Sequence, residues 1–335
     1  MKPSIKKRVV CDLCHHRCRL SPGQIGRCGV RQGAIGKIES LVYGKLVAEN
    51  VDPIEKKPLF HVLPGTLTYS IATRGCNFRC LHCQNSSISQ VADGLSPLDG
   101  NNRQTITRMP QEVVDRALGT DCKSISYTYV EPTVFFEYAY DCAILAKQQG
   151  LGNIFVSNGY MSDTVLNLLA PVLTAINIDL KSWSESFYKK VCGARLAPVV
   201  ENIRKCIELG IWVEVTTLLI PGMNDSASEL KDIAMFLAGL DRNIPWHVTA
   251  FYPTYKMTGL APTPISTINL ARQIGIDCGL HYVYSGNVSG GRGMATDCPA
   301  CGDKLIARSN FTLQQNLVTK GTCPSCHADI AGVWK

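Results

Sequence analysis

The sequence predicts an α/β protein built on a partial or full barrel of the TIM type, with a small cysteine-rich extension at each end. Between residues 69 and 285, short runs rich in β-branched residues alternate with longer amphipathic segments. Repeated strand–helix units of this kind form parallel sheets with right-handed crossovers. Further cysteine clusters lie outside the repeats. We therefore expect three domains, at 1–60, 61–290 and 291–335.

Seven segments are predicted to be strands because β-branched and aromatic residues dominate them. They are 69–73, 124–129, 153–157, 175–180, 212–220, 246–251 and 280–285. Amphipathic helices are predicted between the strands. They are 110–118, 132–149, 162–170, 197–209, 226–240 and 265–277. The polar segment 86–104 is rich in turn formers and is predicted to be a loop beside the mouth of the barrel.

Length and composition indicate a globular protein. A chain of 335 residues, 45% of them hydrophobic, is long enough for one large core with small appendages. It shows neither the apolar run of a secretory signal nor that of a membrane span, so we expect a cytoplasmic protein without a membrane partner. Residues 1–60 hold 12 Lys and Arg against 5 Asp and Glu. This basic segment is either a solvated face or a surface for an anionic partner.

The cysteine triplet Cys76, Cys80 and Cys83 has no fourth cysteine nearby. Structural zinc sites are closed by four ligands, whereas three thiolates on a [4Fe–4S] cluster leave one iron free to bind another molecule. The triplet also follows the first predicted strand, and catalytic groups gather at the C-terminal ends of barrel strands. The spacing therefore favours an iron–sulfur site over a zinc site completed by His82 or a distant residue.

Polar residues follow the later strands in the same way. Glu131 comes after the second strand and Asn158 after the third. Asp179 and Lys181 end the fourth, and His247 lies on or just before the sixth. Because these strand ends face one mouth, we expect the side chains to converge. Taken singly, Glu131 could be a salt-bridged rim carboxylate, Lys181 a solvated lysine and His247 a core histidine.

The order of these motifs resembles the radical S-adenosylmethionine (SAM) superfamily. The cysteine triplet, YVEPT, SNG, DLK, PGMND and WH are similar to the glycyl-radical-enzyme activases, such as the pyruvate formate-lyase activating enzyme. The sequence is more similar still to the radical SAM member of the AmmeMemoRadiSam system. That resemblance covers nearly the whole chain and rests on CDLCHHRCRLSPGQIGRCGVR (11–31), VYGKLVAENVDPIEKKPLFH (42–61), YKKVCGARLAPVVENI (188–203) and the C-terminal GVW.

The resemblance implies a radical SAM enzyme. Three thiolates would hold a [4Fe–4S] cluster whose free iron binds the amino and carboxylate groups of SAM. An electron from the reduced cluster would cleave SAM to methionine and a 5′-deoxyadenosyl radical, which abstracts hydrogen from the substrate. The resemblance also implies a reducing electron donor of the flavodoxin or ferredoxin type, and partners of the Memo and AMMECR types.

The resemblance further implies which residues bind SAM near the second and third strands. Glu131 would pair with the SAM ammonium group, although Tyr129 and Val130 stand where the family has two glycines. Asn158 lies in a Ser-Asn-Gly stretch similar to the activases' Thr-Asn-Gly.

The remaining expected roles fall on residues beside the cysteines and in the later strands. Asp179 and Lys181 would bind the ribose and carboxylate of SAM, since a lysine supplies a point charge for an anion. His247 would lie beside SAM or substrate, and with Lys181 it is the expected catalytic residue. Phe78 and His82 flank the cysteines and are expected to contact the cofactor, with His82 covering the adenine.

The C-terminal cysteines form two CxxC knuckles separated by 21 residues. Their residues are Cys298, Cys301, Cys323 and Cys326. Each knuckle would present two thiolates to one tetrahedral ion, so this spacing predicts a zinc ribbon. An auxiliary iron–sulfur cluster is the alternative.

The N-terminal cysteines are less decisive. Cys11, Cys14, Cys18 and Cys28 could hold structural zinc, which we favour, or an auxiliary iron–sulfur cluster. His15 or His16 could replace one of the four thiolates.

The substrate class stays open between two enzymatic hypotheses. An activase would take hydrogen from a glycine of a large partner protein. A modifier of RNA or of a smaller molecule would use the basic N-terminal segment to position an anionic substrate. A non-enzymatic iron–sulfur or zinc scaffold that carries electrons explains the cysteines but not the polar residues at the strand ends.

Overall fold

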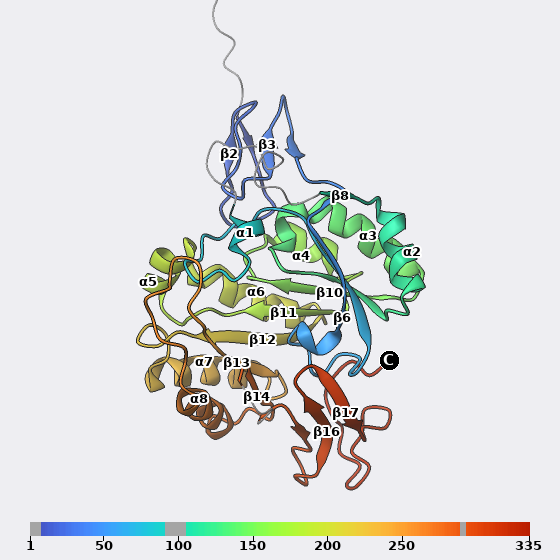
Figure 1. The fold of residues 1–335 in the computed structure, drawn as a ribbon, viewed down its shortest axis with the longest axis vertical. Coiled ribbons are helices and arrows are strands. Elements are labelled where there is room, and N and C mark those ends of the chain that lie inside the picture. Colours follow the sequence, from blue (N-terminus) through green and yellow to red (C-terminus); the bar gives the residue numbers. More distant parts are fainter. Residues whose placement is uncertain (1–7, 91–104, 289–292) are drawn as a thin grey trace, which may run out of the picture.

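The computed structural model describes residues 8–90, 105–288 and 293–335. Its centre is an eight-stranded sheet in the order β14-β13-β12-β11-β10-β9-β7-β6 (Figure 1). The strands are β6 (Ala48–Pro53), β7 (Leu67–Ala72), β9 (Ser124–Tyr127), β10 (Gly152–Ser157), β11 (Ala175–Asp179), β12 (Trp212–Leu219), β13 (Trp246–Ala250) and β14 (Val283–Gly286). Every neighbouring pair is parallel except β6 with β7. Within the described ranges β14 does not pair with β6, so the barrel is partial.

The predicted fold class is confirmed, and each of the seven predicted strands is present. The eighth strand, β6, was not predicted. Its sequence AENVDP contains one β-branched residue, Val51, which is exposed. Antiparallel pairing with β7, from Ala48 opposite Ala72 to Pro53 opposite Leu67, holds this segment in the sheet. Residues 1–60 therefore contribute an edge strand to the barrel.

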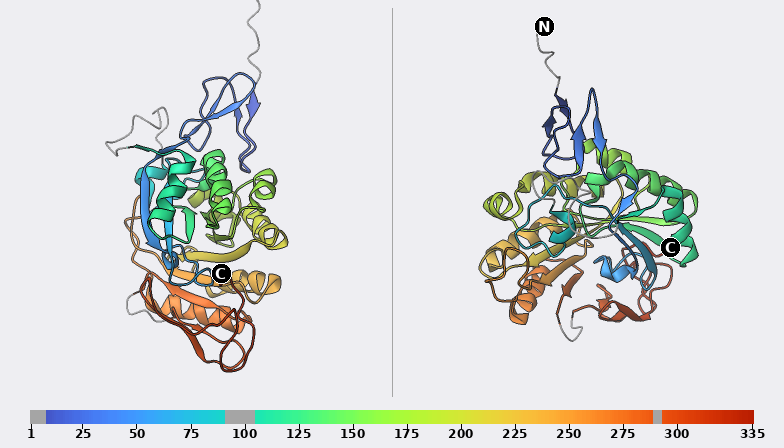
Figure 2. Two further views of the ribbon diagram at one scale, coloured as in Figure 1. Left: turned by 90° about the vertical axis from the view of Figure 1, so that its right-hand side faces the viewer. Right: turned by 45° about the horizontal axis from the view of Figure 1, so that its top comes forward.

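Helices cover the outer face of the sheet, as the two views in Figure 2 show. They are α2 (Pro110–Gly119), α3 (Phe136–Gln148), α4 (Asp163–Leu169), α5 (Glu185–Phe187), α6 (Leu196–Glu208), α7 (Ala227–Leu240) and α8 (Ile265–Asp277). In α6, Val199, Ile203 and Cys206 recur at i, i+4 and i+7 and are fully buried. Burying an aliphatic side chain of this size contributes about 1.5–3 kcal/mol. The amphipathic pattern thus fixes the face that each helix packs on the sheet.

One predicted helix and one predicted loop differ in detail from the structure. The predicted helix 132–149 begins as a 3-10 turn (Pro132–Phe135), because the Glu131 side chain accepts a hydrogen bond from the Thr133 amide and caps it. The predicted loop 86–104 begins with a helical turn, α1 (Ser86–Ser89). Residues 91–104 of that loop lie outside the described residues.

The N-terminal region projects from one end of the molecule as short antiparallel pairs (Figure 1). The strands are β1 (Val9–Val10), β2 (Arg19–Leu20), β3 (Arg31–Gly33) and β4 (Ile38–Ser40), and β5 (Lys45–Leu46) pairs with β8 (Ile106–Thr107). Further short turns are 3-10 (Ile54–Lys56) and π-helical (Tyr188–Cys192). Among the described residues, no helix combines the length and apolar character needed to cross a membrane.

The C-terminal region is a three-stranded sheet of β15 (Thr296–Asp297), β16 (Lys304–Ser309) and β17 (Thr312–Asn316). Arg308 fixes it to the barrel. Its guanidinium donates to the Phe60 carbonyl at 2.6 Å and to Thr296 Oγ1 at 3.0 Å, and lies 4.3 Å from the centre of the Phe60 ring. His61 Nδ1 lies 2.7 Å from the Ala331 carbonyl oxygen. Phe60 and His61, which precede β7, therefore connect the barrel to the C-terminal region.

Candidate active site

The carboxyl ends of the parallel strands open into one cavity of about 880 Å³. Every residue that the sequence assigned to the barrel site lines it: Cys76, Phe78, Cys80, His82, Cys83, Glu131, Asn158, Asp179, Lys181 and His247. These side chains come from segments up to 171 positions apart in sequence, between Cys76 and His247. The structure brings them together; the role of each stays a prediction.

The three cysteines lie on the loop between β7 and α1. The Cys76 sulfur accepts from the Phe78 amide at 3.4 Å, and the Cys83 sulfur lies 3.1 Å from Ser89 Oγ. Burial raises the pKa of both thiols. A hydrogen bond with the Cys192 thiol, together with burial, raises the pKa of Cys80. Metal binding must therefore displace a proton from each sulfur at neutral pH.

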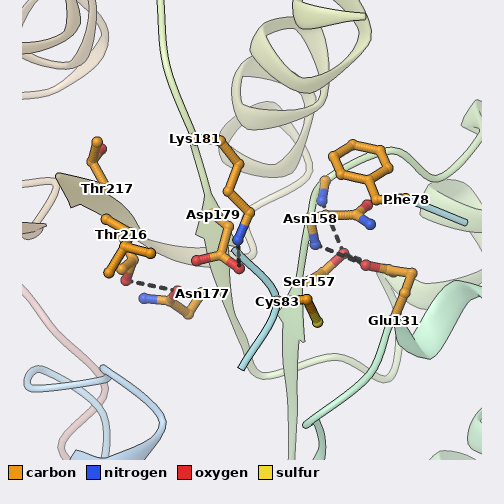
Figure 3. A network of polar contacts seen from close by, with 12 residues as sticks. Phe78, Cys83, Glu131, Ser157, Asn158, Asn177, Asp179, Lys181, Thr216 and Thr217 are labelled. Carbon is orange, nitrogen blue, oxygen red and sulfur yellow. Dashed lines mark hydrogen bonds and ion pairs between the residues drawn. The ribbon is translucent and has the colours of Figure 1, made fainter. Parts of the chain in front are cut away.

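Glu131 is almost fully buried and accepts several hydrogen bonds (Figure 3). Thr133 donates through its amide at 3.1 Å and its hydroxyl at 2.5 Å. Ser157 Oγ donates at 2.9 Å and the Asn158 amide at 2.8 Å. Burial raises the pKa of Glu131 despite these donors. The carboxylate thus ties the end of β9 to the end of β10, a structural role that sequence reasoning did not assign to it.

Tyr129 stands where the resembled family has glycine, yet its backbone lies in the left-handed region with φ of 62°. L-residues other than Asn and Asp seldom adopt this conformation, which glycine adopts freely. Asn85 Nδ2 donates to the Tyr129 carbonyl at 2.7 Å, and the ring lies 4.6 Å from Lys57 Nζ. These contacts hold the non-glycine residue in a turn that glycine would favour.

Asp179 and Lys181 form an ion pair at the end of β11, with Nζ 2.7 Å from Oδ2 (Figure 3). Burial would lower the pKa of Lys181, but the Asp179 carboxylate and the nearby Cys80 raise it above its usual range. Lys181 is therefore a cation at neutral pH. It faces a cavity in which an anionic group would find a fixed positive charge.

His247 on β13 is held by a buried carboxylate, Glu214 on β12, which sequence reasoning missed. Glu214 Oε2 lies 2.6 Å from His247 Nε2, and its oxygens accept from the backbone amides of Phe60 at 3.0 Å and His61 at 2.8 Å. Burial would raise the pKa of Glu214, but these hydrogen bonds and His247 lower it. A charged residue inside the apolar run WVEVTTLLI was the available signal, because buried carboxylates need partners.

His82 has no hydrogen-bond partner on either ring nitrogen, although both atoms are buried. Burial, with Lys181 nearby, lowers the pKa of His82 to about 3, so the ring is neutral. Buried polar atoms normally have partners, so this ring fits a site completed by a polar ligand such as adenine. Phe78 instead packs edge-on against Tyr160, with ring centres 5.2 Å apart.

A second group of cavity residues, which the sequence did not indicate, lies beside β6 and the C-terminal region. It includes Lys57, Tyr129 and Phe311. Lys57 is 2% exposed and pairs with Asp52 at 2.6 Å. Burial lowers the pKa of Lys57 to about 8. These side chains extend the cavity beyond the residues expected to bind SAM.

The four C-terminal cysteines form the ligand set predicted from their spacing. All four sulfurs lie within 4.8 Å of one another, and two of the contacts are 3.6 Å for Cys298 with Cys326 and 3.8 Å for Cys301 with Cys323. Four sulfurs about 2.3 Å from one tetrahedral ion lie about 3.8 Å apart. The site is therefore preformed for a single metal ion, and zinc stays the prediction for its identity.

The N-terminal cysteines also come together. Cys11, Cys14, Cys18 and Cys28 line one small cavity together with His16 and Arg31. His16 Nε2 lies 2.9 Å from the Asn77 carbonyl oxygen, so this ring is tied to the loop of the cysteine triplet. Burial lowers the pKa of His16 to about 4. His15 packs against Tyr160, with ring centres 5.5 Å apart, and is not among the residues that line the cavity.

Comparisons with known proteins agree with this geometry. The family model of the Radical SAM superfamily matches residues 70–237. The uncharacterized protein MJ0808 of Methanocaldococcus jannaschii is 45% identical over 305 residues, which cover 91% of this chain and 89% of that protein. MJ1632 of the same organism, named as a candidate glycyl-radical enzyme activating enzyme, is 25% identical over 193 residues, covering 54% of this chain and 66% of that protein.

Among solved structures, Streptococcus suis SuiB bound to its precursor peptide SuiA aligns with a TM-score of 0.51 and 11% identity. The alignment covers 70% of this chain and 51% of SuiB, so this chain spans about half the length of that protein. SuiB bound to S-adenosylmethionine aligns with a TM-score of 0.50. At this identity the likeness concerns the fold.

Proposed function

The chain belongs to the radical SAM superfamily and is a radical SAM enzyme, and from this premise we propose that it is the SAM-cleaving component of an AmmeMemoRadiSam-type system. The observation that supports SAM cleavage is the convergence of three thiols, an Asp–Lys pair and an unpartnered imidazole on one cavity of about 880 Å³. The enzymatic interpretation is thereby preferred to a scaffold that only carries electrons.

The residues at the cavity fit the cofactors that this superfamily uses. Cys76, Cys80 and Cys83 would hold the [4Fe–4S] cluster and must give up their protons to do so. When bound and reduced, that cluster supplies the electron that cleaves SAM to methionine and a 5′-deoxyadenosyl radical. The three sulfurs of this triplet, all in the described part of the chain, do not lie within 4.8 Å of one another as a set. This wider spacing suits thiolates that each bind a different iron.

The chain's own charges would orient SAM. Lys181 stays protonated beside Asp179 and would bind the carboxylate, while the Asp179 oxygens would accept from the ribose hydroxyls. Glu131 would accept from the ammonium group. Its carboxylate is already held in place by Thr133, Ser157 and the Asn158 amide, so no side-chain ordering is needed at binding.

His82 and His247 would complete the pocket, which both residues line. The neutral His82 ring offers one donor and one acceptor to adenine. His247 is fixed by Glu214 and would contact SAM or substrate without moving. The part of the cavity lined by Lys57, Tyr129 and Phe311 would then receive the substrate.

Membership of the AmmeMemoRadiSam group is supported by the sequence phrases at 11–31, 42–61 and 188–203. It leads us to propose Memo-type and AMMECR-type proteins as partners, and a flavodoxin-like or ferredoxin-like protein as reductant. Combining each purified partner with the reduced enzyme and SAM tests this. A partner that is the substrate or presents it should raise 5′-deoxyadenosine formation several-fold over the enzyme alone.

A second candidate function is activation of a glycyl-radical enzyme, supported by the similarity to MJ1632. The substrate would then be a backbone glycine of a large partner. Electron paramagnetic resonance separates the two candidates, because an activated partner would retain a stable radical signal after the activase is removed.

The decisive experiment is anaerobic. The protein is reconstituted with iron and sulfide, reduced and mixed with SAM, and 5′-deoxyadenosine is quantified. The wild type should form it, and the triple variant Cys76→Ala/Cys80→Ala/Cys83→Ala should not. Cys206→Ala, which removes an isolated buried thiol of α6, is the matched control and should retain activity. A wild type that binds iron and is reducible yet forms none, even with the partners present, would contradict the proposal.

A further inference from the structure

The three cysteine sets differ in how closely their sulfurs approach. The C-terminal set has sulfur–sulfur contacts of 3.6 and 3.8 Å, the spacing expected when thiolates share one ion. The N-terminal set, whose residues are all described, has no such contact, and no three of its sulfurs lie within 4.8 Å of one another. In this respect it matches the cysteine triplet of the active site and not the C-terminal set.

The N-terminal thiols are nevertheless neighbours around one small cavity, which all four residues line. No three of their sulfurs lie within 4.8 Å of one another, whereas the four C-terminal sulfurs all do. The thiols therefore face one cavity at a wider spacing than thiolates that share a single ion.

Two buried donors at this cavity lack partners. Asn77 is 1% exposed and its Nδ2 has no hydrogen-bond partner, while its Oδ1 accepts from Asn158 Nδ2 at 2.7 Å. Arg31 is 4% exposed and its Nε is likewise without a partner, although its terminal nitrogens both bind Glu137 at 2.5 Å. Unpaired buried N–H groups are costly, so both donors fit acceptors that a bound group would supply. Hydrogen bonds to sulfur and nearby charge are established influences on iron–sulfur potentials.

The cavity adjoins the loop of the active-site triplet. Asn77, which lines it, directly follows Cys76 in the chain, and its Oδ1 lies 3.9 Å from the Cys76 sulfur. The Cys28 carbonyl would be 2.7 Å from a Cβ placed on Gly75, which shows how closely the two cysteine loops pack. Asn77 therefore lines the N-terminal cavity and also lies beside the first thiol of the triplet.

We infer that Cys11, Cys14, Cys18 and Cys28 hold a second [4Fe–4S] cluster, one thiolate to each iron, immediately beside the SAM site. Zinc and [2Fe–2S] sites both require at least two sulfurs on the same metal ion, and the sulfur contacts that this produces are seen only in the C-terminal set among the described residues. The zinc favoured from sequence spacing alone gives way to this assignment. With four protein ligands, the cluster has no iron free for a substrate. The inference does not depend on the proposed function.

Metal analysis of the wild-type holoenzyme tests the assignment without any variant. Protein reconstituted and desalted anaerobically should contain about eight irons, about eight sulfides and one zinc per chain. About four irons with two zincs would overturn the inference in favour of zinc. About six irons would overturn it in favour of a [2Fe–2S] cluster.

Variants then locate the second cluster. Cys14→Ser/Cys18→Ser should lose about half of the iron, whereas Cys122→Ser/Cys206→Ser, which removes two isolated buried thiols, should keep all of it. In the dithionite-reduced wild type, two neighbouring paramagnetic clusters should broaden each other's electron paramagnetic resonance signals. That broadening should vanish in the first variant. Full iron content or an unchanged signal in Cys14→Ser/Cys18→Ser would contradict the inference, and circular dichroism establishes that both variants are folded.

Discussion

At the scale of single residues, the Lys181–Asp179 pair is the clearest case in which position and charge determine a function. Lys181 is largely buried and remains cationic because Asp179 lies 2.7 Å away. Replacing it by Met would remove one charge-assisted hydrogen bond, for which losses of about 1.5–3 kcal/mol are usual. We therefore expect Lys181→Met to weaken SAM binding by tenfold or more, measured by anaerobic calorimetry. Lys205→Met, at the surface pair with Asp163, is the control and should leave SAM affinity unchanged. Equal affinities for the two variants would remove Lys181 from the SAM site.

The buried carboxylate Glu214 is expected to matter for stability as well as for His247. In Glu214→Gln the new amide nitrogen faces the backbone N–H of either Phe60 or His61, so one buried hydrogen bond becomes a repulsive contact. An unsatisfied buried group costs about 1–3 kcal/mol. Thermal unfolding should occur several degrees lower than in the wild type. Glu201→Gln, on the exposed face of α6, should leave the transition unchanged.

His61 makes the stability of the protein dependent on pH. Burial lowers its pKa from 6.5 to about 4, and the ring is surrounded by Glu214, Arg308, His247 and Tyr284. The unfolded chain binds a proton below pH 6.5 that the folded chain does not bind until about pH 4. Stability should therefore fall as pH falls through this window, by about 3 kcal/mol in total from this residue.

To isolate His61, the thermal unfolding midpoint is measured at pH 7 and at pH 5, in the wild type and in His61→Gln. The variant should lose part of the wild type's dependence on pH, because one titrating group has been removed. His281→Gln, which changes an exposed histidine, should keep the wild-type dependence. Identical slopes in all three proteins would show that His61 does not contribute.

At the scale of elements, the parallel strands were predictable because each is a short β-branched run separated from the next by an amphipathic helix. Periodicity does not report on partners far away in the sequence, and this is why β6 was missed: its pairing with β7, rather than its own composition, makes it a strand. The same reason applies to Glu214. Its sequence shows an acidic residue in an apolar strand, but the partners that stabilise it, His247 and the Phe60 amide, come from other segments. Cys76 and Lys181 could be placed because strand ends in a parallel barrel share one mouth.

The packing of the N-terminal cysteine loop on the triplet loop can be tested at Gly75. Its φ of 95° suits glycine, and a Cβ there would lie 2.7 Å from the Cys28 carbonyl oxygen. Gly75→Ala should therefore destabilise the junction of the two loops and lower the iron retained after reconstitution. Gly150→Ala shares a positive φ, of 76°, but its Cβ would meet nothing within 4 Å. This control separates backbone strain, about 1 kcal/mol, from the clash between the loops. If both variants retained iron equally, close packing at Gly75 would not be needed for the clusters.

At the scale of the whole molecule, the C-terminal metal site and the barrel are parts of one connected structure. The C-terminal cluster of buried residues is small and includes Leu305, Ile306 and Ile330, so we expect this region to need a metal ion to fold. Folding of that region places Arg308 against Phe60 and Ala331 against His61. The backbone amides of Phe60 and His61 also bind Glu214. Glu214 in turn holds His247. A continuous set of contacts therefore runs from the C-terminal ligands to the active-site cavity.

Removing the C-terminal metal should consequently loosen more than the C-terminal region. In Cys301→Ser/Cys326→Ser, which replaces the two exposed ligands, we expect loss of the bound metal and faster hydrogen exchange over β16 and β17. Hydrogen exchange should also rise in the segment 54–63. Arg308 would no longer hold the Phe60 carbonyl, and Ala331 would no longer hold the His61 imidazole. Helix α7, on the outer face of the barrel, serves as the internal control and should exchange at the wild-type rate. Faster exchange confined to residues 296–335 would show that the two parts fold independently; faster exchange that reaches 54–63 would show that the metal stabilises the wall of the active site.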